Sequence, residues 1–189
     1  MKTKTIISII AAAVIAVSCC QTGNTCTNGG VKKDIAVQLY SVRSLIGAFG
    51  NEASDYKPLL DTLAAMGYTA IEAASYADGK LYGTDPAQFK ADVEAAGLEV
   101  LSSHCNKYLS EKEIKTGDYS ESLKWWDQCI AAHKAAGMKY LVMPYLGVPS
   151  TIKELQAYCD YFNQVGKKCK ENGISFGYHN HAHEFQKVE

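Results

Sequence analysis

The segment HNHAHEF, residues 179–185, is the sharpest chemical feature of the sequence. In an extended strand His179 and His181 occupy alternate positions, so both imidazoles face the same point. His183 and Glu184 follow where that strand should end. Imidazole and carboxylate together form a ligand set for divalent metals. The cluster therefore favours a functional site over a solvated histidine-rich loop or buried core histidines, the two structural alternatives.

The elements that must position these groups repeat along the chain. Four times a helix-like segment ends in glycine and an apolar strand follows at once, at Gly67, Gly97, Gly137 and Gly173. Glycine suits the left-handed backbone conformation just beyond a helix end. Successive glycines lie roughly 30 to 40 residues apart, which is the length of one helix and one strand. The repeat predicts stacked βα units.

Capping residues and apolar spacing set the expected boundaries of these units. One helix should begin at a cap on Ser54 or Asp55, and a second at Asp85, where a first-turn proline follows. Two further helices are predicted over residues 119–136 and 151–172. The strands are predicted over residues 35–41, 68–74, 98–104, 138–144 and 174–181.

Strands joined by helices run parallel with right-handed crossovers, so an open doubly wound sheet and a closed barrel both fit. Small or polar side chains share one face of two predicted strands: Ser175, Gly177, His179 and His181 in the last, and Val100, Ser102 and His104 in the third. An open sheet covered by helices should be apolar on both faces, and no glycine-rich phosphate loop follows the first strand. We predict an α/β fold over residues 34–189, an incomplete (β/α)8 TIM barrel with about five βα units. We expect it to be truncated at the C-terminus, because five strands do not close an eight-stranded barrel.

Four segments carry a resemblance to a known family. IAVQLYSVR, GYTAIEAAS, LEVLSSHCN and GYHNHAHEF, in this order and spacing, resemble the sugar phosphate isomerase/epimerase family of xylose-isomerase-like TIM barrels. The resemblance covers residues 35–189 and is greatest to exported bacterial members with YHNHxxEF in the fifth strand. It implies proton transfer next to a sugar carbonyl, with a divalent metal and neighbouring groups stabilising an enediolate.

The resemblance also implies which residues take part. The family metal, expected here as Mn, Zn, Co or Mg, is held at the barrel mouth by Glu, Asp, His and Glu from strands five to eight. Glu184 is the best match to the first ligand and His179 occupies the aligned position, so both are kept as metal ligands. We expect the remaining ligands to be missing from this chain. Glu184 is also expected to be catalytic.

Earlier strand ends are expected to bind a small-molecule carbohydrate. His104 is assigned to catalysis by substrate contact or acid–base work, with core burial as its alternative. The substrate-binding residues are expected to be Gln38, Glu72, His181 and Tyr145. For Glu72 a surface salt bridge is an equal alternative.

Three other activities stay open beside isomerase or epimerase chemistry. Lyase or dehydratase chemistry can pass through the same enediolate, and a lipid-anchored barrel can bind carbohydrate without turning it over. Phosphodiester hydrolysis is disfavoured, because the net charge is -1, with 19 basic and 20 acidic residues, and no basic stripe occurs. Nucleic acid is therefore not expected as a partner.

The N-terminus has the layout of a secretory signal. Lys2 and Lys4 precede an uncharged apolar run, residues 6–17, that is shorter than the ~20 residues needed to span a bilayer. The run ends in Ser18-Cys19-Cys20, which resembles a bacterial lipobox, in which cleavage precedes a cysteine that carries lipid.

We predict from this a lipoprotein signal peptide over residues 1–18, lipidation of Cys19, with Cys20 as the alternative, and a flexible tether over residues 19–33. The protein is then exported and lipid-anchored to a bacterial membrane, facing the periplasm or the cell surface. An ordinary cleaved signal peptide is the alternative.

Cysteines and aromatic residues elsewhere indicate packing. Cys105, Cys129, Cys159 and Cys169 are widely spaced in apolar patterns without a CxxC motif, so we predict core thiols, with one bridge as an open alternative. His133 is predicted to be structural, and Trp126 to pack a helix against the barrel.

Overall fold

The computed structural model describes residues 33–46 and 55–188 of the 189-residue chain. In this part, five strands form one sheet in the order β1-β2-β5-β6-β7, and every pairing is parallel. The strands are β1 (Ala36–Gln38), β2 (Ala70–Ala73), β5 (Glu99–His104), β6 (Tyr140–Met143) and β7 (Ser175–Tyr178). Their order in the sheet follows their order in the chain, with no reversal, which is the arrangement of a barrel rather than of a doubly wound sheet. The prediction of a partial barrel with about five βα units is confirmed.

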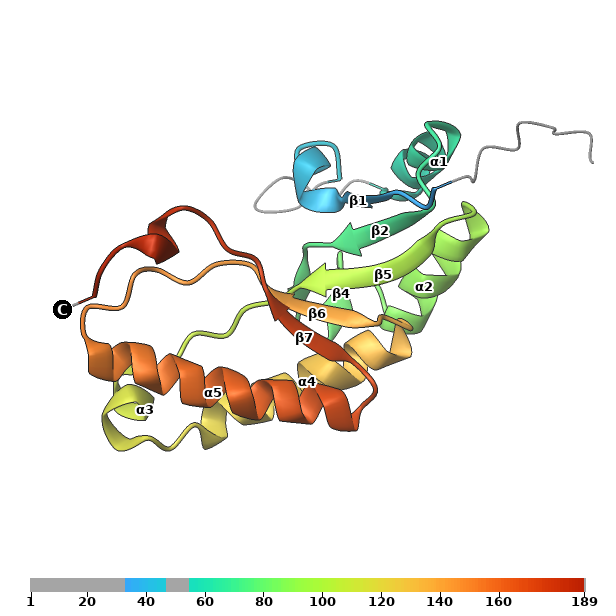
Figure 1. The fold of residues 1–189 in the computed structure, drawn as a ribbon. Coiled ribbons are helices and arrows are strands. Elements are labelled where there is room, and N and C mark those ends of the chain that lie inside the picture. The colour runs from blue at the N-terminus through green and yellow to red at the C-terminus, as the bar shows by residue number, and fades with distance from the viewer. Residues whose placement is uncertain (1–32, 47–54, 189) are drawn as a thin grey trace, which may run out of the picture. The chain divides into compact units, whose positions relative to one another are not determined.

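Four longer helices connect the strands. They are α1 (Lys57–Ala65), α2 (Pro86–Ala95), α4 (Ser120–Ala135) and α5 (Ile152–Glu171). Figure 1 shows α2, α4 and α5 along the same face of the sheet, with all five arrowheads at one edge. The opposite face corresponds to the interior of a barrel, so the carboxyl ends of the strands form the edge where functional groups are expected.

The helix ends match the sequence pattern closely. The four repeat glycines, at positions 67, 97, 137 and 173, all have positive φ, between 76° and 96°. Asp85 caps α2 by accepting hydrogen bonds from the backbone N–H groups of Ala87 and Gln88. In α1 the cap position is Tyr56, which provides no side-chain hydrogen bond, while the Asp55 carboxylate accepts from the backbone of Lys57. Ser54, the other predicted cap, lies outside the described residues.

The core consists of two apolar clusters on the helix-covered face. One surrounds Leu60, Ile71 and Phe89, and the other contains Trp126 and Tyr161. Trp126 is fully buried, its ring centroid is 5.5 Å from that of Phe176 in β7, and its indole N–H donates to the Tyr161 hydroxyl over 2.6 Å. The predicted packing of this tryptophan between helix and barrel is confirmed.

Five short elements of the described residues were not predicted. A hairpin of β3 (Tyr76–Ala77) and β4 (Lys80–Leu81) follows β2. The helix α3 (Glu111–Thr116) begins at a capping box in which Ser110 and Glu113 exchange hydrogen bonds. Two 3-10 turns, η1 (Leu39–Val42) and η2 (His183–Phe185), follow the ends of β1 and β7.

Two predictions about strand faces are wrong. Val100 was expected to share a face with Ser102 and His104, but it packs in the core with Ile71, because the β2–β5 register shifts between Ile71 and Glu72. His179 and His181 were expected inside the last strand, but β7 ends at Tyr178. The backbone N–H of His181 donates to the Glu184 carboxylate over 2.7 Å, so the chain turns away from the sheet.

The four cysteines of the described residues are free. Cys105, Cys129 and Cys169 are buried, as predicted. Cys159 was predicted in the core but is exposed on α5, where its neighbours Tyr158 and Tyr161 provide the buried side chains instead.

The predicted signal peptide, Cys19 and the tether up to residue 32 lie outside the described residues. Within the part of the chain that the structure describes, the helices are too short or too polar to span a bilayer.

Candidate functional site

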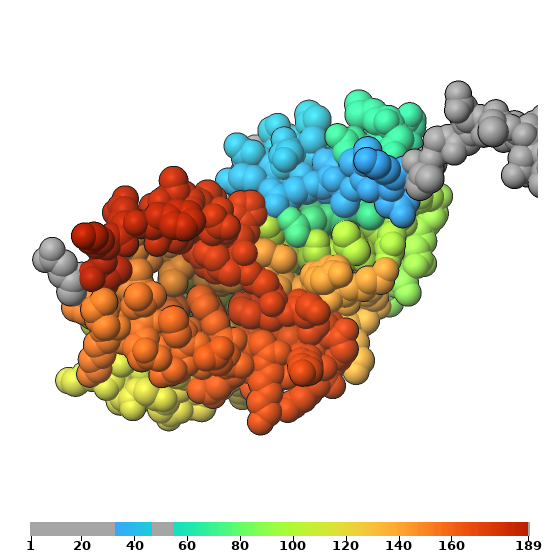
Figure 2. Space-filling model, in the orientation of Figure 1, coloured from blue at the N-terminus to red at the C-terminus, as the bar shows by residue number. Residues whose placement is uncertain are grey.

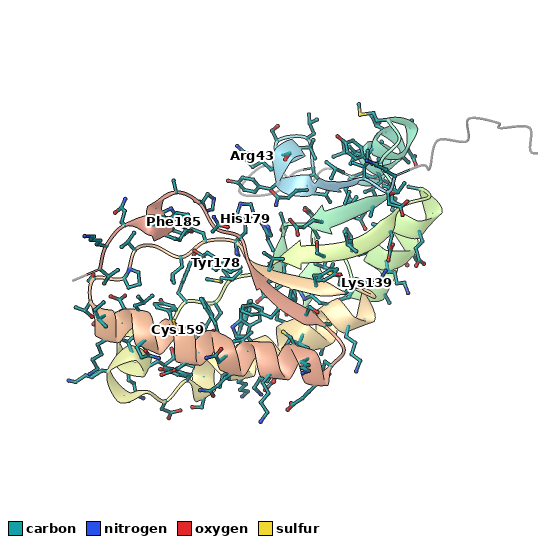
Figure 3. The ribbon with its side chains drawn as sticks, in the orientation of Figure 1. Arg43, Lys139, Cys159, Tyr178, His179 and Phe185 are labelled. Atoms are coloured by element: carbon teal, nitrogen blue, oxygen red, sulfur yellow. The ribbon has the colours of Figure 1, made fainter. Side chains whose placement is uncertain are left out.

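The candidate site lies at the carboxyl ends of the parallel strands. Gln38 is the last residue of β1, Glu72 is the second-to-last residue of β2, and His104 is the last residue of β5. His179 is the first residue beyond β7. Figure 3 shows His179 at this edge and Lys139 at the opposite end of the sheet. The parallel topology thus brings residues from distant parts of the sequence to one edge.

Glu72 is the centre of a hydrogen-bonded group. Its Oε1 accepts from the side-chain amide of Gln38 over 2.7 Å and lies 3.0 Å from Nε2 of His104. Its Oε2 accepts from the hydroxyl of Ser102 over 2.6 Å. The Glu72 side chain is 20% exposed and that of His104 is 9% exposed, so these contacts are largely shielded from bulk water.

These neighbours determine the ionisation of Glu72. Burial acts to raise the pKa of Glu72, but hydrogen bonds from His104, Ser102 and Gln38 outweigh it and lower that pKa to about 2. The carboxylate is therefore ionised at neutral pH and is a weak base. Glu72 is therefore better suited to orient the side chains that bond to it than to act as a general acid or base.

His104 has a hydrogen-bond partner in either protonation state of its Nε2. When this nitrogen carries a proton, it donates to Glu72 at 3.0 Å. When it does not, it accepts from the amide of Gln38, also at 3.0 Å. Glu72 and Gln38 therefore hold the Nε2 side of the imidazole and fix the orientation of the ring.

A row of imidazoles extends from His104 to the C-terminal segment. The rings of His104 and His179 meet edge to face with centroids 5.2 Å apart, and the ring of His181 lies 4.9 Å from that of His179. The ring of His183 stacks 5.5 Å beyond His181. The group around Glu72 is thereby continuous with the HNHAHEF segment.

Glu184 is the centre of a second polar group. Its Oε1 accepts from the Tyr178 hydroxyl over 2.7 Å and lies 3.3 Å from Nε2 of His183 and 3.6 Å from Nδ1 of His181. Partial burial acts to raise the pKa of Glu184, but the hydrogen bond from Tyr178, backbone N–H groups and the charge of His183 lower it to about 2. The turn η2 brings these side chains together by reversing the chain directly after β7.

Tyr145 covers this second group. Its ring lies 4.8 Å from that of His183 and 5.8 Å from that of His181. The ring is half exposed, and it comes from the loop between β6 and α5. The neighbouring Leu146 accepts a hydrogen bond from Nε2 of His183 through its carbonyl and donates its N–H to the Tyr178 hydroxyl.

The donor set of the second group suits a divalent cation. One ligand atom from each of His181, His183 and Glu184 lies within 4.8 Å of the other two. Two imidazoles and an ionised carboxylate are common ligands of Zn²⁺, Mn²⁺ and Co²⁺. The chemistry of these three side chains and the distances between their ligand atoms therefore fit a metal site.

Comparison with known proteins identifies the fold family. A family model described as xylose isomerase-like TIM barrel matches residues 60–188. The chain belongs to this family.

Solved structures agree with this membership. Two structures of sugar phosphate isomerase/epimerase proteins from Parabacteroides distasonis ATCC 8503 are similar to the chain. The first has 32% sequence identity and a TM-score of 0.69, and the match covers 82% of this chain and 57% of that one. The second has 26% identity and a TM-score of 0.70, and covers 86% and 56%.

A zinc-bound structure of the IOLI protein shares the fold at 14% identity and a TM-score of 0.56, with coverage of 77% and 51%. The chain thus spans a little over half the length of these proteins. A comparison with curated proteins gave no match.

In this xylose isomerase-like barrel, the structure places every predicted site residue of the barrel at the same edge. Gln38, Glu72 and His104 form one group. Glu184, His181 and Tyr145 belong to the other. His179 lies between them and outside the set of three possible metal ligands, so its assignment to the metal stays a prediction.

Two contributors were missed. The Ser102 hydroxyl donates to Glu72, and the Tyr178 hydroxyl donates to Glu184. Ser102 could have been found from its position two residues before His104. Tyr178 could not, because its hydroxyl meets Glu184 only through the turn after β7.

A cavity of about 350 Å³ lies beside Glu184, away from Glu72. Its walls are mostly apolar and come from the loop after β6, the start of α5 and the C-terminal segment, including Leu146, Ile152 and Val188. In Figure 2 the red C-terminal segment lies over the orange residues that contain this loop. Apolar walls do not match the hydroxyl groups of a sugar, so we place the sugar site at the polar groups instead.

Proposed function

We propose that the chain belongs to a divalent-metal-dependent isomerase or epimerase that acts on a sugar or keto-sugar by proton transfer next to the carbonyl. The observation that carries this proposal is the hydrogen-bonded group of Gln38, Glu72 and His104, which shares one edge of the barrel with the Glu184 group. Membership of the xylose isomerase-like family and similarity to sugar phosphate isomerase/epimerase proteins support it.

His181, His183 and Glu184 would hold the metal ion in this proposal. When bound, a divalent cation polarises a carbonyl oxygen and so makes the adjacent C–H bond more acidic. The low pKa of Glu184, about 2, keeps its carboxylate ionised for this task across the neutral range.

His104 would move the proton at the carbon next to the carbonyl. Its Nε2 is held by Glu72 and Gln38, so the other ring nitrogen, Nδ1, would take up the proton and return it. Glu72 fixes the ring orientation and stabilises the imidazolium form. Gln38 and Glu72 are also close enough to the edge to bind sugar hydroxyl groups.

Tyr145 and His181 would form one wall of the sugar site. Exposure of half the Tyr145 ring leaves an aromatic face for the apolar side of a sugar ring. The predicted export of the protein supports an unphosphorylated substrate, because phosphosugars are mainly cytoplasmic.

Solvent-deuterium exchange tests the proposal. The full chain is incubated in D2O with D-fructose and with added Mn²⁺, Zn²⁺, Co²⁺ or Mg²⁺, and NMR follows loss of the proton next to the carbonyl. We expect metal-dependent exchange that falls about 100-fold or more in His104→Asn, the lower end of the contribution of a general acid–base group.

The matched control is Glu99→Gln, which changes a carboxylate at the opposite end of the same strand as His104. It should leave exchange unchanged. If the chain binds the sugar but shows no deuterium exchange with any of the added metal ions, a carbohydrate-binding function would replace the enzymatic proposal. Exchange that persists in His104→Asn would remove this residue from the mechanism.

A further inference from the structure

A second cluster of metal-ligating side chains lies on the other face of the sheet, outside the proposed sugar site. Cys105 follows the end of β5, and Cys129 and His133 lie one turn apart on α4. Cys105 is 4% exposed, and Cys129 and His133 are fully buried. The proposed function uses none of these three residues.

The three side chains are close enough to share one ion. One ligand atom from each lies within 4.8 Å of the other two, and Sγ of Cys105 is 3.2 Å from Nε2 of His133. A tetrahedral Zn²⁺ with bonds of ~2.3 Å to sulfur and ~2.0 Å to nitrogen needs its ligand atoms roughly 3.5 to 3.8 Å apart. The cluster therefore needs only small side-chain movements to reach this geometry.

The tautomer of His133 also suits a ligand. Its Nδ1 is 2.6 Å from the carbonyl oxygen of Cys129, to which it donates as an N–H. This bond fixes the ring and leaves Nε2 directed at Cys105 with a lone pair available. A metal-bound imidazole in proteins usually has its second nitrogen bonded in this way.

We propose that Cys105, Cys129 and His133 form a buried binding site for a thiophilic divalent cation, with Zn²⁺ as the natural occupant. The hydroxyl of Ser103 lies 3.8 Å from Sγ of Cys105 and would supply an oxygen for a fourth position. Binding deprotonates the thiols, so each bound Zn²⁺ releases protons to solvent.

An aromatic ring shields the cluster from solvent. The ring of Tyr76 lies 4.8 Å from that of His133 and covers the cluster from the hairpin side.

The site would connect the end of β5 to α4. Because Cys105 directly follows His104, an ion at this position would fix the strand end that presents His104 to the opposite face. The cation would therefore be structural, and distinct from the one proposed at His181, His183 and Glu184, whose ligands include no sulfur.

Cobalt titration tests the proposal, because Co²⁺ bound to thiolates gives a charge-transfer absorption that oxygen and nitrogen ligands do not give. The full chain carries Cys19→Ser, Cys20→Ser and Cys26→Ser to remove the N-terminal thiols, and is kept reduced. We expect one equivalent of Co²⁺ to produce the thiolate band and one equivalent of Zn²⁺ to remove it. Zn²⁺ should also raise the Tm of the protein.

In the same background, Cys105→Ser and Cys129→Ser should each abolish the band, while Cys159→Ser, which changes the exposed cysteine of α5, and Glu184→Gln should retain it. Absence of the band in the parent protein, or its persistence in Cys105→Ser, would overturn the proposal. A Cys105–Cys129 disulfide in the purified, unreduced protein would also overturn it. If Cys105→Ser does not fold, the parent protein's band and Tm shift still decide the matter.

Discussion

Replacing Glu72 by glutamine removes the charge at the centre of the candidate site and keeps the size of the side chain. The folded protein lowers the pKa of Glu72 from 4.5 to about 2, because His104, Ser102 and Gln38 bond its ionised form despite partial burial. A carboxylate whose pKa is lower in the folded state stabilises folding above its ordinary pKa. That stabilisation is lost as the pH falls through the folded value.

The size of the effect follows from the pKa difference. Each pKa unit corresponds to ~1.4 kcal/mol, so Glu72 contributes at most ~3 kcal/mol at pH 7. At pH 3 only roughly half of that contribution remains, because the carboxylate in the unfolded chain is already protonated. The free energy of unfolding of Glu72→Gln should therefore lie about 2 to 3 kcal/mol below that of the parent at pH 7, with a smaller gap at pH 3.

Urea unfolding at pH 7, 5 and 3 measures this gap. Glu99→Gln, at the exposed opposite end of the sheet, is the matched control and should show little pH-dependent difference from the parent. Other carboxylates, Glu184 included, titrate alike in parent and variant, so they cancel in the difference. A gap that stays constant from pH 7 to pH 3 would refute the assignment of Glu72 as an ionised centre.

Three further predictions test other parts of the account. Glu184→Gln should weaken Mn²⁺ binding at least about tenfold in calorimetry, because it removes the charged ligand of the proposed metal site; unchanged affinity would exclude Glu184. Trp126→Phe should lower the free energy of unfolding by about 1 to 3 kcal/mol in urea, since the buried hydroxyl of Tyr161 loses its indole donor, whereas Trp125→Phe, which lacks such a bond, should cost less. Cys19→Ala should abolish lipid modification in mass spectra of the protein expressed in a bacterium; a lipid that persists would move the modification to Cys20, and a parent protein without lipid would contradict the lipoprotein prediction.

The local sequence pattern determined most of the fold. A glycine with positive φ terminates each repeat helix because the left-handed position there strongly favours a residue without a Cβ, so the βα units could be read directly. The helix α3 carried the same kind of local signal, the capping box of Ser110 and Glu113, and could have been found from it. The register shift beside Glu72 left no local trace, because it depends on how two strands pair.

The candidate site could be predicted only as far as topology alone positions it. Gln38, Glu72 and His104 were predictable because parallel strands present their carboxyl ends at one edge. The contact between Tyr178 and Glu184 was not, because it depends on a turn that begins after the last strand. The cluster of Cys105, Cys129 and His133 was predicted as packing, since thiols and an imidazole in apolar patterns give the same signal whether or not they bind an ion.

The central claim is that the imidazoles and carboxylates of the strand ends gather at one edge that accepts a divalent cation. Paramagnetic broadening by Mn²⁺ tests it most directly, because Mn²⁺ prefers oxygen and nitrogen ligands to thiolates. In an assigned NMR spectrum, resonances of residues 179–184 and His104 should broaden at substoichiometric Mn²⁺. Those of Glu99, about 17 Å from His104 along β5, should stay comparatively sharp. Broadening confined to the Glu99 end, or spread evenly over the chain, would contradict the account.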